Sequence, residues 1–158
     1  MKRGATLFLR AVLVLIGIGA MAFLLGEPHI EGRNANATLF EIYFKDPFLA
    51  YAYLGSTPFF IGLYQAFKVL AFAGRNQEFT LSAVKSVRTI KHCAIALIGF
   101  VAVGEIFIIL GNSDDHAGGV VIGILIIFAS MVVAAVMAVL QPALQNAVNM
   151  MSENDATE

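Results

Sequence analysis

Four long apolar stretches constrain the fold of this chain more than any other feature. They cover residues 5–25, 47–73, 93–110 and 120–140, and few charged side chains lie inside them. A helix of about 20 mostly apolar residues is long enough to cross the roughly 30 Å hydrocarbon core of a bilayer. The sequence therefore predicts an all-α membrane protein in which four transmembrane helices pack as an antiparallel bundle.

The composition of the chain excludes most soluble folds. The 158 residues are 59% hydrophobic and 13% charged, whereas soluble domains are about 45–50% apolar and about 25% charged. A net charge of −1 offers no global attraction to nucleic acid, and the single cysteine excludes an intramolecular disulfide. We expect one integral membrane domain over residues 1–158, surrounded by a lipid bilayer, with a flexible tail at 152–158 and no nucleic-acid partner.

The N-terminal apolar stretch also has features of a signal peptide. A basic start is followed by the small residues Ala20-Met21-Ala22, which resemble a cleavage site. The apolar stretch continues beyond them to Leu25, however, and we expect it to remain in the protein as the first span.

Positive charges concentrate on one side of the predicted membrane. Eight of the ten Lys and Arg residues lie around the start of the first span, near the end of the second span, or in the loop between the second and third spans. They are Lys2, Arg3, Arg10, Lys68, Arg75, Lys85, Arg88 and Lys91. Loops rich in Lys and Arg stay in the cytoplasm. The sequence thus predicts a multi-pass protein of the cell membrane with the N-terminus, the C-terminus and residues 74–92 in the cytoplasm.

Residues 80–92 have the pattern of a short amphipathic cytoplasmic helix between spans two and three. Thr80 is a suitable N-cap, and the apolar face contains Val87, Ile90 and Ala94. The basic face consists of Lys85, Arg88, Lys91 and His92. Such a helix can lie on the inner membrane surface or extend the third span into water. It serves either as a topological anchor alone or as a docking site for a cytoplasmic protein partner or anionic lipid headgroups.

Three segments resemble a bacterial family of small four-span membrane proteins known as domain of unknown function 2975. They are "DPFLAYAYLGSTPFFIGLYQAFKVL", "EFTLSAVKSVRTIKHCA" and the closing "LQPALQNAVNMMSEND". The resemblance covers nearly the whole chain. It implies a regulatory or envelope-stress context, and it carries over no catalytic residues.

Glu105 is the intramembrane charged candidate, because it lies inside the third apolar stretch. Ionisable groups at such depth are candidate functional sites. A protonatable carboxyl group could serve proton-coupled transport; alternatively, Glu105 lies near the outer interface or hydrogen-bonds to Tyr53, Ser56 or Thr57. Arg10 lies near the opposite membrane face, about 15 Å away in depth, and we expect it to reach the inner headgroups.

Other features of the apolar stretches favour structural roles. Pro58 predicts a kink in the second span, and paired small residues such as Gly119 and Gly123 allow close helix packing or a homo-oligomer. The outer acidic and histidine residues do not match a metal-binding signature: His29, Asp114, Asp115 and His116. We predict no metal, no cofactor and no enzymatic activity.

The sequence leaves two classes of function open. The first is a non-enzymatic membrane protein with a regulatory, accessory or interaction role. The alternative is a small oligomeric transporter or channel that uses Glu105 as a protonatable site.

Overall fold

The computed structural model describes residues 3–30, 36, 38–44, 47–75, 79–111 and 116–155. Within these ranges the chain forms five α-helices: α1 (Arg3–Ile30), α2 (Leu39–Phe44), α3 (Pro47–Ala73), α4 (Leu81–Leu110) and α5 (His116–Asp155). The predicted all-α class is therefore correct.

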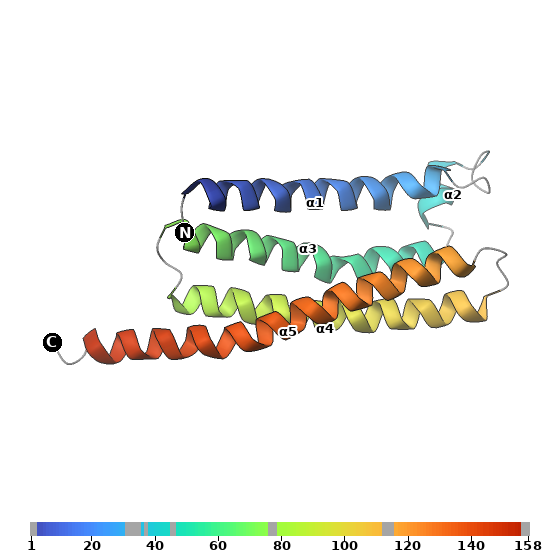
Figure 1. Cartoon of the computed structure of the whole chain (residues 1–158). Helices are drawn as coiled ribbons and strands as arrows, with labels where there is room; N and C mark the ends of the chain where they lie inside the picture. The colour runs from blue at the N-terminus through green and yellow to red at the C-terminus, as the bar shows by residue number, and fades with distance from the viewer. Residues whose placement is uncertain are drawn as a thin grey trace.

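The four long helices run antiparallel, as predicted, and pack in chain order (Figure 1). The main contacts are those of α1 with α3, α3 with α4, and α4 with α5. The short α2 lies near the ends of α1 and α3, away from the chain termini. The helices thus form an open row in the described part of the chain, because α1 and α5 lie at its two edges.

Three of the long helices are apolar and long enough to cross a membrane: Gly4–Gly26 in α1, Leu81–Leu110, and Gly118–Asn154 in α5. The helix α3 has a similar length of 27 residues. It contains the polar side chains Ser56, Gln65 and Lys68 and is not among these candidate spans. Three of the four predicted spans are therefore supported, and the second predicted span, which corresponds to α3, stays a prediction.

The helix α4 corrects the predicted boundary between a cytoplasmic helix and the third span. Thr80 is its N-cap, as expected, and the Thr80 Oγ1 accepts a 3.2 Å hydrogen bond from the Ala83 amide. From Leu81 the helix continues without a break to Leu110. The prediction of a separate short helix is thus wrong, because nothing at His92–Cys93 interrupts the backbone hydrogen bonds.

The helix α5 also extends beyond its predicted span. It continues through Pro142 to Asp155 and contains 40 residues, which corresponds to a length of about 60 Å. A proline inside a helix removes one backbone hydrogen bond, yet α5 does not end there. Its last turns project beyond the first turn of α4 (Figure 1).

Close glycine contacts set the register between α3 and α4. A methyl group added to Gly55 would lie 3.4 Å from Phe100 Cβ, and one added to Gly62 would lie 3.4 Å from Cys93 Cβ. These contacts show that the two antiparallel helices approach closely, in the way that small residues permit.

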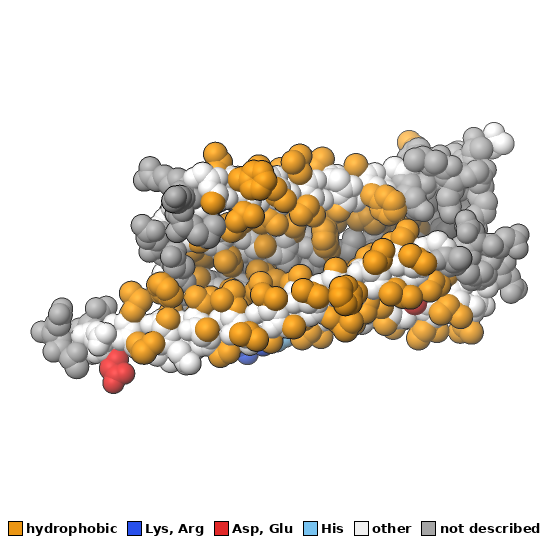
Figure 2. All heavy atoms as spheres, viewed as in Figure 1, with side chains coloured by type: hydrophobic (Ala, Val, Ile, Leu, Met, Phe, Trp, Pro, Cys, Tyr) orange, Lys and Arg blue, Asp and Glu red, His pale blue; other side chains and the backbone are white. Residues whose placement is uncertain are grey.

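The best-buried side chains belong to the first turns of α4. They are Ala83, Val84, Val87, Ile90 and Ala94, and Val87 is fully buried. Elsewhere large apolar side chains cover the surface (Figure 2). Such a surface is unusual for a protein in water, where large exposed apolar patches are rare.

Candidate functional site

The predicted basic face of α4 lies on the surface. Lys85, Arg88 and His92 are exposed, and they follow one another at helical spacings of three and four residues. The His92 Nδ1 lies 2.7 Å from the Arg88 carbonyl oxygen. These three side chains, which we call the basic row, form one polar stripe beside the buried apolar face.

Lys91 differs from the basic row because it contacts α5. It is half-buried, and its Nζ donates a 2.7 Å hydrogen bond to the Gln141 Oε1. The apolar residues of the same turns are buried within the protein. The first turns of α4 therefore continue directly into the long helix. Of the two expected arrangements, the structure has the helix that extends the third span and not a separate helix on the membrane surface.

Glu105 lies in the contact between α4 and α5. A methyl group added to Gly123 of α5 would overlap the Glu105 carboxylate, and the neighbouring contact joins Ile108 to Gly119. The Glu105 Oε2 is buried and has no hydrogen-bond partner among the described residues. The missing Gly123 side chain thus leaves a notch that holds the carboxyl group.

The hydroxyl groups expected to bond Glu105 are engaged elsewhere. The Tyr53 hydroxyl donates to the Leu24 carbonyl of α1 at 3.2 Å, while Ser56 and Thr57 donate to the Tyr53 carbonyl at 2.8 and 3.4 Å. The expected hydrogen bonds from these hydroxyl groups to Glu105 are therefore not present in the structure.

The comparisons with known proteins identify the family. The family profile described as "Protein of unknown function (DUF2975)" matches residues 33–157. The chain belongs to this family. It is 42% identical over 159 residues to the "Uncharacterized membrane protein YoaS" of Bacillus subtilis (strain 168), and the match covers 99% of each chain. The resemblance inferred from the sequence is confirmed, and this DUF2975 protein is a membrane protein with several candidate spans. No solved structure matches the chain.

Arg10 of this DUF2975 protein binds a neighbouring helix. Its Nη2 donates to the Leu70 carbonyl oxygen near the end of α3 at 3.3 Å, and its guanidinium lies 5.5 Å from the centre of the Phe67 ring. The same carbonyl oxygen accepts the Gly74 amide at 3.0 Å, and cations interact favourably with the carbonyl groups at helix C-termini. Arg10 thus joins α1 to α3, and its extension to the headgroups stays a prediction.

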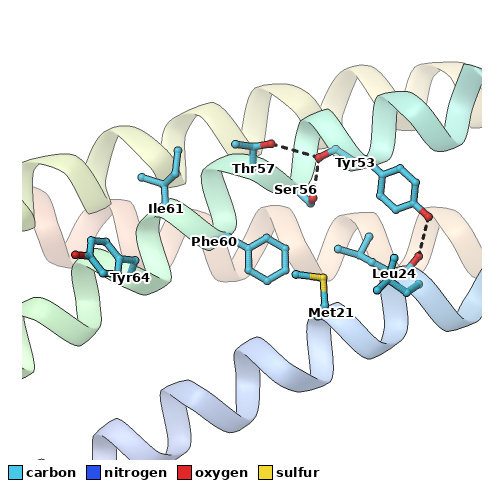
Figure 3. A pocket seen from close by; sticks show the side chains of 9 residues that line it. Met21, Leu24, Tyr53, Ser56, Thr57, Phe60, Ile61 and Tyr64 are labelled. Carbon is cyan, nitrogen blue, oxygen red and sulfur yellow. Dashed lines mark hydrogen bonds between the residues drawn. The ribbon is translucent and has the colours of Figure 1, made fainter. Parts of the chain in front are cut away.

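A groove of about 520 Å³ opens between α1 and α3 (Figure 3). Its lining is mostly apolar: Met21, Leu24, Leu25, Tyr53, Ser56, Thr57, Phe60, Ile61 and Tyr64. The hydroxyl groups of Tyr53, Ser56 and Thr57 all donate to backbone carbonyls. The groove therefore offers little polar chemistry, and sequence reasoning did not find it because no motif marks it.

The remaining predicted sites add no chemistry in the described part of the chain. There, no group of three His, Cys, Asp or Glu residues could hold a metal ion. The side chains of His29, Asp114, Asp115 and His116 lie outside the described residues. The helix α3 passes through Pro58 without a break, and the kink at this residue stays a prediction.

Proposed function

We propose that this DUF2975 protein is a non-enzymatic, multi-pass protein of the cell membrane that acts through a docking surface at its cytoplasmic end. This end comprises the first turns of α4 and the last turns of α5, with the basic row as its polar surface. The role is regulatory or accessory: the protein holds a partner at the membrane and does not convert a substrate.

One observation carries the proposal: the pattern of exposure inverts along α4. From Ala83 to Ile90 the apolar side chains are buried and Lys85 and Arg88 are exposed, although Leu81 in the first turn is 58% exposed. Beyond them, Ile95, Ile106 and Phe107 are 54%, 55% and 59% exposed. Apolar side chains gain from burial only where the alternative is water. The first turns therefore suit an aqueous environment, and the later turns suit lipid.

Two independent features support a membrane boundary near Lys91. A span of about 20 residues counted back from Leu110 reaches this residue. On α5, Val139 is an exposed apolar residue and Gln141, two positions later, bonds to Lys91. The α5 residues beyond Gln141 then extend into the cytoplasm together with the first turns of α4.

The other helices fit this boundary if the row of helices is tilted. Arg10 is level with Leu70, and the α3–α4 register places Lys68 level with Val87, four residues before Lys91. From Arg10 on α1 to Lys91 on α4, the level of the cations along the helix axes thus changes by about 9 Å. Across the row, α1 and α4 are separated by two interaxial distances of about 9 Å each. This corresponds to a tilt of about 25–30°, within the range of about 0–40° for membrane helices.

Cysteine labelling tests the proposed topology. In a Cys93→Ser background, single cysteines would replace Ser82 near the start of α4 and Gly118 near the start of α5, both exposed. A membrane-impermeant maleimide added to intact cells should label Gly118→Cys, and should label Ser82→Cys only after the membrane is permeabilised. Labelling of both positions in intact cells would contradict a cytoplasmic basic row.

Affinity capture tests the docking role. We expect the triple variant Lys85→Gln, Arg88→Gln, His92→Gln to lose proteins that co-purify with the wild type from native membranes. Arg75→Gln, which removes an exposed cation just beyond α3, is the matched control and should retain them. Lys91 is left unchanged because it bonds to α5. An identical set of partners for wild type and triple variant would remove the basic row as the docking surface.

A further inference from the structure

We propose that Glu105 is a proton-binding site: its carboxyl group, seated in the Gly123 notch, carries a proton while α4 and α5 are packed as in this structure. The site lies at the opposite end of α4 from the basic row and does not depend on the proposed docking function. Its geometry rests on a buried carboxyl oxygen without a partner and on direct contact with the α5 backbone at Gly123.

Among the side chains that the structure describes, no counter-charge faces Glu105 from the helices packed against α4; His116 of α5, seven residues before Gly123, lies outside them. On α5, the residues from Gly118 to Leu140 include no charged or titratable side chain. On α3, the titratable group at this level is Tyr51, which contacts Gly104, and its hydroxyl donates to the Phe100 carbonyl at 2.7 Å. On α4 itself the nearest charged or titratable side chains are Cys93 and His92, about 18–20 Å away.

The missing counter-charge decides the protonation state. An isolated carboxylate in an apolar environment is so unfavourable that the group takes up a proton instead. The neutral carboxyl group can pack on the Gly123 backbone in the way that small-residue contacts allow in membranes. Loss of the proton would place an unpaired charge in the α4–α5 contact, and the side chain would leave the notch.

The position of Glu105 makes proton exchange with the outer solution feasible. It lies five positions before Leu110 at the end of α4, a distance of about 7.5 Å along the helix. The site would therefore respond to the proton concentration at the face of the membrane opposite the basic row. Protonation and the packing of α4 on α5 are then two aspects of one equilibrium.

Dicyclohexylcarbodiimide labelling of the full chain in lipid nanodiscs tests the site, because this apolar reagent reacts with protonated carboxyl groups. The carboxyl proton moves to one carbodiimide nitrogen while the carboxyl oxygen bonds to the central carbon. The acyl group then shifts to the other nitrogen, and the stable N-acylurea retains every atom of both reactants. Mass spectrometry should find this adduct on Glu105, in an amount that falls as the pH is raised.

Glu153, which is exposed near the end of α5, is the internal control and should remain nearly unlabelled at neutral pH. Glu105→Gln should lose the adduct, and it preserves the size of the side chain so that folding is retained. Labelling of Glu105 that does not exceed that of Glu153, or that does not change with pH, would overturn the proposal.

Infrared spectroscopy gives a second readout that does not rely on chemical reactivity. At neutral pH the wild type should show a carbonyl stretch of a protonated carboxyl group that Glu105→Gln lacks. Gly123→Ala, which fills the notch, should shift this band, whereas Gly118→Ala, which adds a methyl group in open space, should leave it unchanged. Identical spectra for wild type and Glu105→Gln would show that Glu105 carries no proton, and the inference would be wrong.

Discussion

Lys91 and Gln141 join α4 to α5 through a 2.7 Å hydrogen bond between the Lys91 Nζ and the Gln141 Oε1. The bond lies where α4 changes from buried apolar side chains to exposed ones. Gln141 directly precedes Pro142, through which α5 continues. The two helices are therefore linked at the level where we place the inner surface of the bilayer.

Removal of the Lys91 side chain should destabilise the α4–α5 pair. Hydrogen bonds to charged groups contribute about 1.5–3 kcal/mol, and the half-buried position of Lys91 favours the lower end of this range. We expect Lys91→Ala to lower the free energy of unfolding in detergent micelles by roughly 1.5 kcal/mol. Lys85→Ala on the exposed basic row should change it by less than about 0.5 kcal/mol. A double-mutant cycle with Gln141→Ala that yields no coupling would contradict a bond in solution.

The buried first turns of α4 should be more sensitive to truncation than its lipid-facing turns. Ile90 is 7% exposed and Ile95 is 54% exposed, so the same substitution can be compared at two positions of α4 that are five residues apart. We expect Ile90→Ala to cost about 2–5 kcal/mol, as for isoleucine in a well-packed core. Ile95→Ala should cost much less, because lipid replaces the lost contacts. Equal losses in thermal unfolding would show that both positions are packed within protein.

The N-cap of α4 gives a smaller, local effect. Thr80 Oγ1 accepts the hydrogen bond of the Ala83 amide, so Thr80→Ala leaves that donor without its side-chain partner. Loss of such a cap usually costs about 1 kcal/mol. Faster hydrogen exchange of the Ala83 amide is the measurement that checks it. Ser82→Ala, at an exposed position in the same turn, is the control and should leave that exchange rate unchanged.

The long helices could be predicted from the sequence because apolar length and composition determine whether a helix suits a bilayer. The capping signal at Thr80 was also reliable, since α4 begins at Leu81 directly after it. The prediction of a separate amphipathic helix was wrong for a physical reason. The change from a polar to an apolar surface at His92 marks a change in the surroundings of one continuous helix. It does not interrupt the backbone hydrogen bonds of the helix.

The side-chain contacts could not be predicted, because they depend on how the helices are aligned. Sequence reasoning selected Glu105 and noted Gly123, but the antiparallel register of α4 and α5 was needed to bring them together. It did not find the bond of Arg10 to a carbonyl group of α3. Arg10 finds its acceptor on a neighbouring helix, and a linear sequence does not show which helix is the neighbour.

The contact of α3 with α4 gives a final prediction. The Tyr51 hydroxyl donates a 2.7 Å hydrogen bond to the Phe100 carbonyl, and its ring lies 5.8 and 6.0 Å from those of Phe100 and Phe107. Tyr51→Phe removes the hydroxyl and retains the ring. Interhelical hydrogen bonds in membranes contribute about 0.6 kcal/mol on average, so we expect a small but measurable loss of thermal stability in nanodiscs.

Tyr64 provides the matched substitution on the same helix, because its side chain is 62% exposed. Tyr64→Phe should leave the thermal stability unchanged, whereas Tyr51→Phe should lower it. The carbonyl stretch of Phe100, isolated by isotope labelling, should move to higher frequency in Tyr51→Phe only, since that carbonyl loses an acceptor bond. If the frequency does not move, α3 and α4 do not pack in this register, and the tilt derived from the cations of α1, α3 and α4 would also be wrong.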